Sequence, residues 1–450
     1  MKKKSKIGAT IALAVGLVIG WNLQNKQVAE ALLGTNTLVS RSSSGTRGNG
    51  DSVGSDISLD GRYVVFTSYA TNLVSNDTND VSDIFLKDTT TNSISRISVD
   101  SSGNQANASS QGAKISGNGK YVVYYSDASN LVSGDTNGYR DIFRYTIATG
   151  ATQLVSVDSS GNQANQQSYD ADLESEGRFI VFTTESTNLG MTDTNGQTDV
   201  VLKDMTSGTV TYLNQSDSGT LGNGYSSSGR ISCDGRFIAF TSNASNLVSG
   251  DNNGYYDVFL TDMLGTRTVT NVTLGGNGWS SVADISCTGD YLLYTSNATN
   301  QISGDSNGVY DTFRYARSSG VKDRVSIKEN GGTPEQYSSG VALSADGKLA
   351  IFRTSGGTFF TNTTVDHDLS PYYQDDYLVR DMGQTSSKVL AVKADMTAPV
   401  HGVTGNATFS GSNRVVYDSK GAGLVSDDSA AYVDSFIVDL GPANTCITSL

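Results

Sequence analysis

The chain has 450 residues, of which 37% are hydrophobic and 17% charged, so it is neither a membrane-embedded bundle nor a typical disordered chain. Its formal net charge of −14 argues against a nucleic-acid partner, because nucleic-acid binding requires a basic surface. With 2 His and 3 Cys, the chain has little material for a zinc or iron–sulfur cluster. The 49 Gly, together with many Ser, Thr, Asn, β-branched and aromatic residues, favour short strands joined by turns.

The N-terminal segment has the layout of a secretory signal. Four lysines among the first six residues precede an apolar run over residues 7–21, and a polar stretch follows that ends in Ala29-Glu30-Ala31. This run is short for a membrane span, which needs roughly 18 residues or more. We expect residues 1–31 to be cleaved as a signal peptide, with a retained N-terminal anchor as the alternative. The mature chain is then secreted or held at the cell surface, with no membrane span of its own.

The rest of the chain is a repeat of about 58 residues. A turn motif first seen as Ser58-Leu59-Asp60-Gly61-Arg62 recurs along the sequence, and a decayed seventh copy begins at Ser410. The glycines of the first six copies stand at positions 61, 119, 177, 235, 289 and 347, which are 58, 58, 58, 54 and 58 residues apart. A constant period of this length is typical of propellers and solenoids.

Each repeat contains four predicted strands. In the second copy, residues 113–116 lead into an Asn-Gly turn, and the apolar run 121–125 follows without alternation, as expected of a strand buried on both faces. Residues 141–145 and 153–157 supply a third and a fourth strand. Such units describe the blades of a propeller. The sequence therefore predicts that residues 32–450 form one all-β domain, a seven-bladed β-propeller of four-stranded antiparallel blades.

Two segments compete to close the ring. Residues 37–40 align with the fourth strand of the repeat, and so do residues 445–450. Either one would complete the last blade and remove an exposed strand edge. We favour the N-terminal strand.

The Asp-Gly turn with its apolar strand, followed by a strand of the type Asp141-Ile142-Phe143, resembles the repeat of the TolB-like (WD40-like) β-propeller family. The resemblance covers nearly all of the mature chain, but a proline usual in the turn is missing and the loop between the second and third strands is long. The resemblance implies an interaction platform and no particular reaction, because fold does not determine function.

The long loop between the second and third strands is a candidate Ca²⁺ site. Oxygen ligands at its first and third positions and a carboxylate at its seventh are suited to a hard cation. The alternative is plain turn chemistry, in which Asn-Gly makes the turn and the last Asp begins a strand. The candidate ligands are Asp77, Asn79 and Asp83; Asp135, Asn137 and Asp141; Asp193, Asn195 and Asp199; Asp251, Asn253 and Asp257; and Asp305, Asn307 and Asp311.

The cysteines are expected to be small buried thiols. Cys233 and Cys287 occupy equivalent turn positions in consecutive repeats, and Cys446 lies near the C-terminus. We expect equivalent points on neighbouring blades to lie farther apart than the 4.4–6.8 Å between Cα atoms that a disulfide requires.

Catalytic motifs are weak. The chain has no Gly-x-Ser-x-Gly elbow, and neither His367 nor His401 has a nucleophile at a recognisable spacing. Paired carboxylates for glycoside cleavage remain open, because their pairing is spatial. We therefore expect no enzyme, with a secreted glycan-cleaving enzyme as the alternative.

Aromatic residues gather in repeats four to six and indicate a ligand surface on the loop face of the propeller. Repeat six also carries an insertion with Phe359, Phe360, Tyr372 and Tyr373 nearby, and insertions often map to binding faces. The expected function is that of an exported, non-catalytic binding or surface-assembly module for a protein or glycan ligand. The candidate ligand-binding residues are Tyr225, Tyr255, Tyr256, Trp279, Tyr310 and Tyr337.

Overall fold

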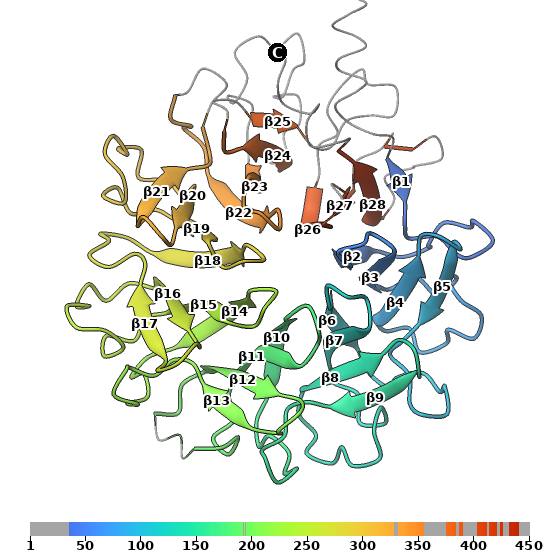
Figure 1. Ribbon diagram of the computed structural model, residues 1–450. Coiled ribbons are helices and arrows are strands. Elements are labelled where there is room, and N and C mark those ends of the chain that lie inside the picture. Colours follow the sequence, from blue (N-terminus) through green and yellow to red (C-terminus); the bar gives the residue numbers. More distant parts are fainter. Residues whose placement is uncertain are drawn as a thin grey trace, which may run out of the picture.

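The computed structural model describes residues 36–191, 193, 195–327, 332–354, 375–383, 387–389, 403–411, 414–420, 424–425 and 432–440. These residues form seven four-stranded antiparallel sheets that stand around a central axis like the blades of a propeller (Figure 1). The inner strand of each sheet contacts the inner strands of both neighbours, and the last contacts the first, so the ring is closed. The all-β fold and the seven blades predicted from the repeat are confirmed.

From the axis outward, blade 1 contains β2 (Ser52–Ile57), β3 (Tyr63–Ser68), β4 (Asp83–Asp88) and β5 (Ser93–Arg96). Blade 2 contains β6 (Ser110–Ile115), β7 (Tyr121–Ser126), β8 (Asp141–Thr146) and β9 (Ala151–Leu154). Blade 3 contains β10 (Ser168–Leu173), β11 (Phe179–Thr184), β12 (Asp199–Asp204) and β13 (Val210–Tyr212). Blade 4 contains β14 (Ser226–Ile231), β15 (Phe237–Ser242), β16 (Asp257–Asp262) and β17 (Thr268–Asn271).

Blade 5 contains β18 (Ser280–Ile285), β19 (Tyr291–Ser296), β20 (Asp311–Ala316) and β21 (Val321–Arg324). Blade 6 contains β22 (Ser338–Leu343), β23 (Leu349–Thr354), β24 (Asp376–Asp381) and β25 (Ser387–Val389). Blade 7 contains β26 (Val403–Phe409), β27 (Arg414–Ser419), β28 (Asp434–Asp439) and, as its outer strand, β1 (Thr37–Leu38).

Both faces of each middle strand are buried, as the unbroken apolar runs predicted. In blade 1, Val65 of β3 packs toward blade 2, whereas Val64 and Phe66 pack toward blade 7. Phe66 also stacks on Phe85, its register partner in β4, at 5.8 Å between ring centroids. Apolar side chains project from both faces of every blade and pack against the neighbouring blades. The hydrophobic core is therefore a series of layers between blades.

The turns between the first and second strands explain the glycine spacing. Gly177 has a φ of +71°, a conformation in which side chains are strained. A Cβ atom there would also lie 2.4 Å from the ring of Tyr121 in the preceding blade. Glycine is thus required both by its own backbone and by the neighbouring repeat. These turns define one end of the molecule, here called the turn face.

The opposite end, here called the loop face, carries the long loops between second and third strands and the connections between blades. Antiparallel pairing places the starts of the first and third strands of a blade at this same end. Residues just before these strands therefore meet on the loop face.

The N-terminal strand closes the ring, as predicted. Leu38 of β1 pairs with Phe436 of β28, and the amide of Val39 donates a 2.8 Å hydrogen bond to the Ser435 carbonyl. The Ser40 hydroxyl donates to the Asp434 carboxylate at 2.7 Å. The competing segment 445–450, the expected signal peptide 1–31 and the insertion aromatics Phe359, Phe360, Tyr372 and Tyr373 lie outside the described residues. Among the residues that the structure describes, no helix is long and apolar enough to cross a membrane.

Candidate functional site

Tyr225, Tyr256 and Trp279 meet on the loop face and form what we call the aromatic row. Tyr225 precedes β14, Tyr256 precedes β16 and Trp279 precedes β18, so the row crosses from blade 4 to blade 5. The ring centroids of Tyr225 and Tyr256 are 6.0 Å apart, and those of Tyr256 and Trp279 are 5.6 Å apart. Both contacts are edge-to-face, a geometry that aromatic pairs favour.

The backbone under Trp279 is held on both sides. Its amide donates a 2.7 Å hydrogen bond to the side-chain oxygen of Asn297, and its carbonyl accepts from the Asn297 amide at 3.1 Å. The preceding Gly278 allows this approach, because a Cβ there would lie 2.4 Å from the same Asn297 oxygen. The indole itself is 50% exposed. Trp279 is therefore a well-anchored residue that still presents half of its side chain to solvent.

The remaining predicted aromatics occupy related places. Tyr310 and Tyr337 contact each other edge-to-face at 5.8 Å across the boundary between blades 5 and 6. Tyr255 lies on the surface beside Tyr256 and is 36% exposed. The structure thus brings five of the six predicted residues into two groups of contacting rings, and Tyr255 lies beside one of them.

Exposed aromatics also occur outside blades four to six, which the sequence analysis missed. Tyr69 in blade 1, Tyr139 in blade 2 and Tyr432 in blade 7 are 40–48% exposed. Tyr139, Tyr255 and Tyr432 each stand two residues before the Asp that begins a third strand. This shared repeat position is the signal that would have found them.

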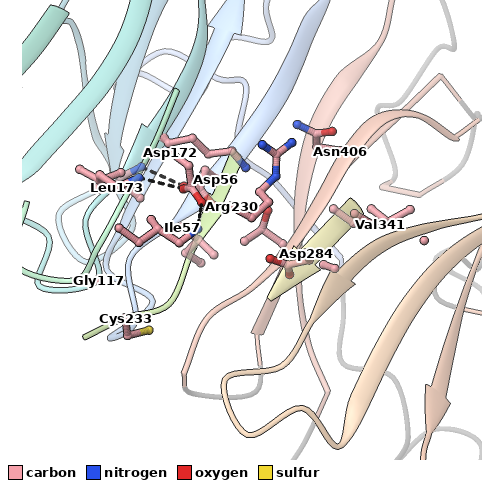
Figure 2. A pocket seen from close by; sticks show the side chains of 18 of the residues that line it. Asp56, Ile57, Gly117, Asp172, Leu173, Arg230, Cys233, Asp284, Val341 and Asn406 are labelled. Carbon is pink, nitrogen blue, oxygen red and sulfur yellow. Dashed lines mark hydrogen bonds between the residues drawn. The ribbon is translucent and has the colours of Figure 1, made fainter. Parts of the chain in front are cut away.

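A cavity of about 370 Å³ lies on the axis toward the turn face (Figure 2). Charged residues from the fifth position of consecutive inner strands line it, and their signs alternate around five blades. Aligning the inner strands of the repeats would have revealed this pattern, which the sequence analysis did not use. The residues are Asp56, Lys114, Asp172, Arg230 and Asp284.

The axial carboxylates join neighbouring blades. Asp56 accepts a 2.8 Å hydrogen bond from the Ile115 amide in blade 2, and Asp284 accepts one of 2.7 Å from the Leu343 amide in blade 6. Burial raises the pKa of Asp284 to about 6. Burial alone would lower the pKa of Arg230, but the carboxylates around it raise that pKa above its ordinary value. The axial carboxylates therefore link the blades through main-chain hydrogen bonds and favour the charged form of Arg230, whereas burial disfavours the charged form of Asp284.

In the candidate Ca²⁺ loops, the Asn side chain acts as a hydrogen-bond donor through its NH₂ group. Asn137 donates through Nδ2 to the Asp141 carboxylate at 2.7 Å and to the Ala164 carbonyl at 3.0 Å. Its oxygen accepts from the Tyr139 amide within the same loop. Asn79, Asn253 and Asn307 make the same pair of contacts, whereas the close contact of Asn195 is to the Gly222 carbonyl.

The two carboxylates of each of these five loops are buried or nearly so, but their surroundings differ. Burial raises the pKa of Asp199 in blade 3 to about 6; a hydrogen bond from Asn214 opposes this rise, and the nearby Asp193 contributes to it. Burial also raises the pKa of Asp83 in blade 1, but there Arg96 acts in the opposite direction. In the part of the chain that the structure describes, no group of three or more His, Cys, Asp or Glu side chains could hold a metal ion.

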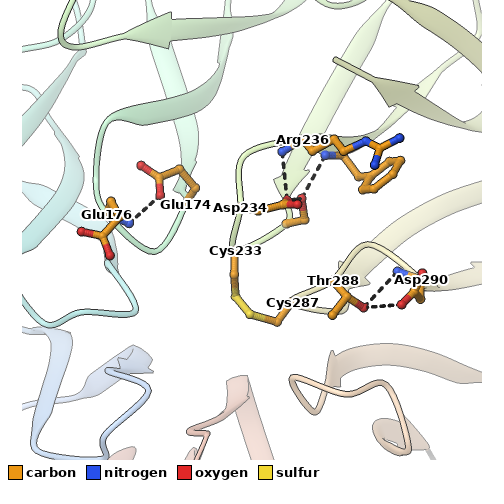
Figure 3. Close-up of a disulfide and its surroundings, with 10 residues drawn as sticks. Glu174, Glu176, Cys233, Asp234, Arg236, Cys287, Thr288 and Asp290 are labelled. Carbon is orange, nitrogen blue, oxygen red and sulfur yellow. Dashed lines mark hydrogen bonds between the residues drawn. A yellow bond between two sulfur atoms is a disulfide. The ribbon is translucent and has the colours of Figure 1, made fainter. Parts of the chain in front are cut away.

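Cys233 and Cys287 form a disulfide bond, so the expectation of isolated thiols was wrong (Figure 3). Their Cα atoms are 4.5 Å apart. The turns of consecutive blades converge near the axis and bond to one another, as when the Cys233 amide donates to the Cys287 carbonyl at 2.9 Å. Equivalent turn residues therefore lie as close as paired strands, which the linear repeat could not indicate. Cys446, His367 and His401 lie outside the described residues.

The fold is shared with several known proteins. No family model and no curated protein matches the sequence. An oligogalacturonate lyase from Vibrio parahaemolyticus is similar over 93% of both chains, at 11% identity and a TM-score of 0.50. A puromycin-hydrolyzing peptidase from Mycobacterium tuberculosis, at 11% identity and a TM-score of 0.50, is matched over 86% of this chain and 52% of its own.

TolB structures are also among the similar folds. TolB from Acinetobacter baumannii is matched over 68% of this chain, at 14% identity and a TM-score of 0.39. The match spans 58% of that TolB chain. At such identities the likeness concerns the fold, and the similar folds include both enzymes and TolB.

Proposed function

We propose that this protein is an exported, non-catalytic propeller that binds a protein or glycan ligand through the aromatic row on its loop face. The observation that carries this proposal is the half-exposed Trp279. Its backbone is hydrogen-bonded to Asn297, and its ring makes an edge-to-face contact with Tyr256. Tyr and Trp dominate the binding energy of interfaces because they offer a large, rigid contact area. A ring that is already positioned loses little conformational freedom when a ligand covers it.

The charge of the chain supports neutral or cationic ligands. The net charge of −14 makes approach of an anionic partner unfavourable and attracts a basic one. Glycans without acidic groups and basic protein segments both fit this condition. Aromatic faces bind sugars through apolar contact and hold Lys or Arg through cation–π attraction.

Export is supported by two independent features. The lysine-rich start and apolar run of residues 1–31 have the layout of a secretory signal. The Cys233–Cys287 disulfide is typical of proteins that fold outside a reducing cytoplasm.

The ligand can be found and the site tested with the same protein. The purified protein is screened on an array of neutral oligosaccharides and on an array of Lys- and Arg-rich peptides. We expect Trp279→Ala to weaken the strongest hit by about 30-fold, or roughly 2 kcal/mol, as for an interface anchor. Tyr69→Ala is the control, because Tyr69 is equally exposed but belongs to blade 1. Equal binding by both variants, or a hit weakened only by Tyr69→Ala, contradicts the proposal.

A glycan-cleaving enzyme is the second candidate, and the axial cavity favours it. Asp284 lines this cavity, and a partly buried carboxyl with a pKa of about 6 could donate a proton near neutral pH. The hydrogen bond from the Leu343 amide, however, gives the Asp284 carboxylate a role in joining blades. Hydrolysis or elimination of an oligosaccharide by the wild type, abolished in Asp284→Asn, would favour this candidate over the binding module.

A further inference from the structure

The five loops with candidate metal ligands all bring two carboxylates together, but different residues stand against them. The second carboxylate begins the third strand, and the first lies six residues earlier in the loop. The fourth strand supplies the residue that faces them. By strand register, the equivalent residues are Arg96, Leu154, Tyr212, Asn271 and Arg324 in blades 1 to 5.

Blades 1 and 5 place a cation against the two carboxylates. In blade 5, Arg324 lies 2.8 Å from Asp305 and 3.6 Å from Asp311. In blade 1, Arg96 lies 3.1 Å from Asp77 and 3.6 Å from Asp83. These guanidinium groups are nearly inaccessible to solvent, so each neutralises the charge of the pair from inside the protein.

In blade 4, hydrogen bonds rather than an arginine stabilise the two neighbouring carboxylates. Asn271 donates to the Asp251 carboxylate at 3.1 Å, and Asn253 donates to Asp257 at 3.0 Å. In blade 2, where Leu154 stands against the pair, Asn137 donates to Asp141. Blade 4 therefore has an amide donor at the position of the arginines, and blade 2 keeps the contact between loop Asn and strand Asp that blades 1 and 5 also have.

Blade 3 satisfies only one oxygen of each carboxylate: Asn214 donates to Asp199 Oδ1 at 2.5 Å, and the main-chain amide of Asn195 donates to Asp193 Oδ1 at 2.8 Å. Tyr212 stands at the position of the arginines, and its hydroxyl donates to the Ser186 carbonyl rather than to a carboxylate. Asp193 is 7% exposed and Asp199 is fully buried, yet Oδ2 of each lacks a hydrogen-bond partner. Asn195 Nδ2 donates to the Gly222 carbonyl at 2.7 Å, so neither Oδ2 atom has a close hydrogen-bond donor. A buried carboxylate oxygen without a donor is costly.

We propose that the Asp193–Asp199 pair of blade 3 binds a hard cation of the Ca²⁺ class, in the place where blades 1 and 5 hold an arginine. Two carboxylate oxygens contribute the charged ligands. Main-chain oxygens of residues 195–198 and water complete the six to eight oxygens that Ca²⁺ takes. The cation site is thus a local replacement for an internal ion pair, and the other four loops are held together without metal.

The first test compares matched variants in the full-length protein. We expect the melting temperature of the wild type to rise between excess chelator and millimolar Ca²⁺, because the cation binds the folded state. Asp193→Asn should lose this rise. Asp305→Asn, which changes the equivalent residue of an arginine-filled blade, should keep it. An unchanged wild-type melting temperature, or a rise that persists in Asp193→Asn, overturns the proposal.

The second test introduces an arginine side chain in place of the proposed metal ion. Tyr212→Arg keeps both carboxylates and copies the arrangement of Arg324 at the same register position. We expect this variant to show no Ca²⁺-dependent rise while matching or exceeding the chelator-treated wild type in melting temperature. If Asp193→Asn fails to fold, Tyr212→Arg carries the test, and a Ca²⁺ response retained in it would contradict the proposal. If Tyr212→Arg in turn fails to fold, Tb³⁺ titration of native wild type decides, with saturable Tyr-sensitised emission that Ca²⁺ displaces supporting the site and its absence overturning it.

Discussion

The turn face and the loop face are built from the same seven repeats, but they are held together differently. On the turn face, main-chain hydrogen bonds join the turns of consecutive blades, and the Cys233–Cys287 disulfide reinforces one of these contacts. On the loop face, the residue before the inner strand is Ser109 in blade 2, Gln167 in blade 3 and Trp279 in blade 5. The turn glycines thus recur in each of the first six repeats, whereas the residue before the inner strand differs from blade to blade.

The largest expected loss of stability comes from removing the disulfide, which lies on the turn face only. It closes a loop of 54 residues, so replacing both Cys233 and Cys287 with Ser should destabilise the protein by roughly 4 kcal/mol in the chain-entropy model. Chemical denaturation of the variant and the wild type measures this difference. Reducing agent should lower the stability of the wild type and leave the variant unchanged. Equal stability of the two proteins would show that the turn face needs no covalent link.

Two glycines with the same backbone conformation give the next comparison. Gly177 on the turn face and Gly138 on the loop face have φ values of +71° and +73°. Gly138→Ala should cost about 1 kcal/mol, because only backbone strain is added and nothing lies within 4 Å of the new Cβ. Gly177→Ala should cost roughly 3 kcal/mol, because its Cβ also collides with the Tyr121 ring. Similar losses in urea denaturation would mean that the neighbouring blade moves aside freely.

The axial carboxylate Asp284 predicts a dependence on pH. Its pKa of about 6 lies above the ordinary 3.8, so the folded protein takes up its proton more readily than the unfolded chain. The stability from this group is present below about pH 4 and lost as the pH rises through 6, by roughly 2 kcal/mol. Asp172 and Arg230 are charged residues near it. Asp284→Asn should therefore lose less stability than the wild type between pH 4 and 7, and a parallel decline in both would contradict this assignment.

The smallest effect on stability is expected for Trp279→Ala. A half-exposed side chain on the loop face should change the free energy of unfolding by no more than about 0.5 kcal/mol. This variant thus separates ligand binding from folding. A loss comparable to that of Gly177→Ala would indicate that the aromatic row supports the blades rather than a ligand.

Much of the fold could be predicted because the same residue types recur at a constant spacing along the sequence. The turn glycines, the unbroken apolar second strands and the N-terminal strand that closes blade 7 all follow from residue types at constant spacing. The candidate ligand-binding tyrosines and Trp279 were also found in this way, as departures from an otherwise regular position. Their contacts with one another across blades were not visible in any single repeat.

What the sequence alone determined is the number of blades, the strands within them and the positions at which repeats differ, because these depend on local patterns of residue type. Only the tertiary structure decided which equivalent positions meet. On the turn face, the turns of neighbouring blades lie close enough for Cys233 to bond to Cys287. Within the blades, Arg96 lies against Asp83, whereas Tyr212 lies at the same register position near Asp199. Distances between blades depend on the radius of the closed ring, and that radius results from the packing of all seven blades together.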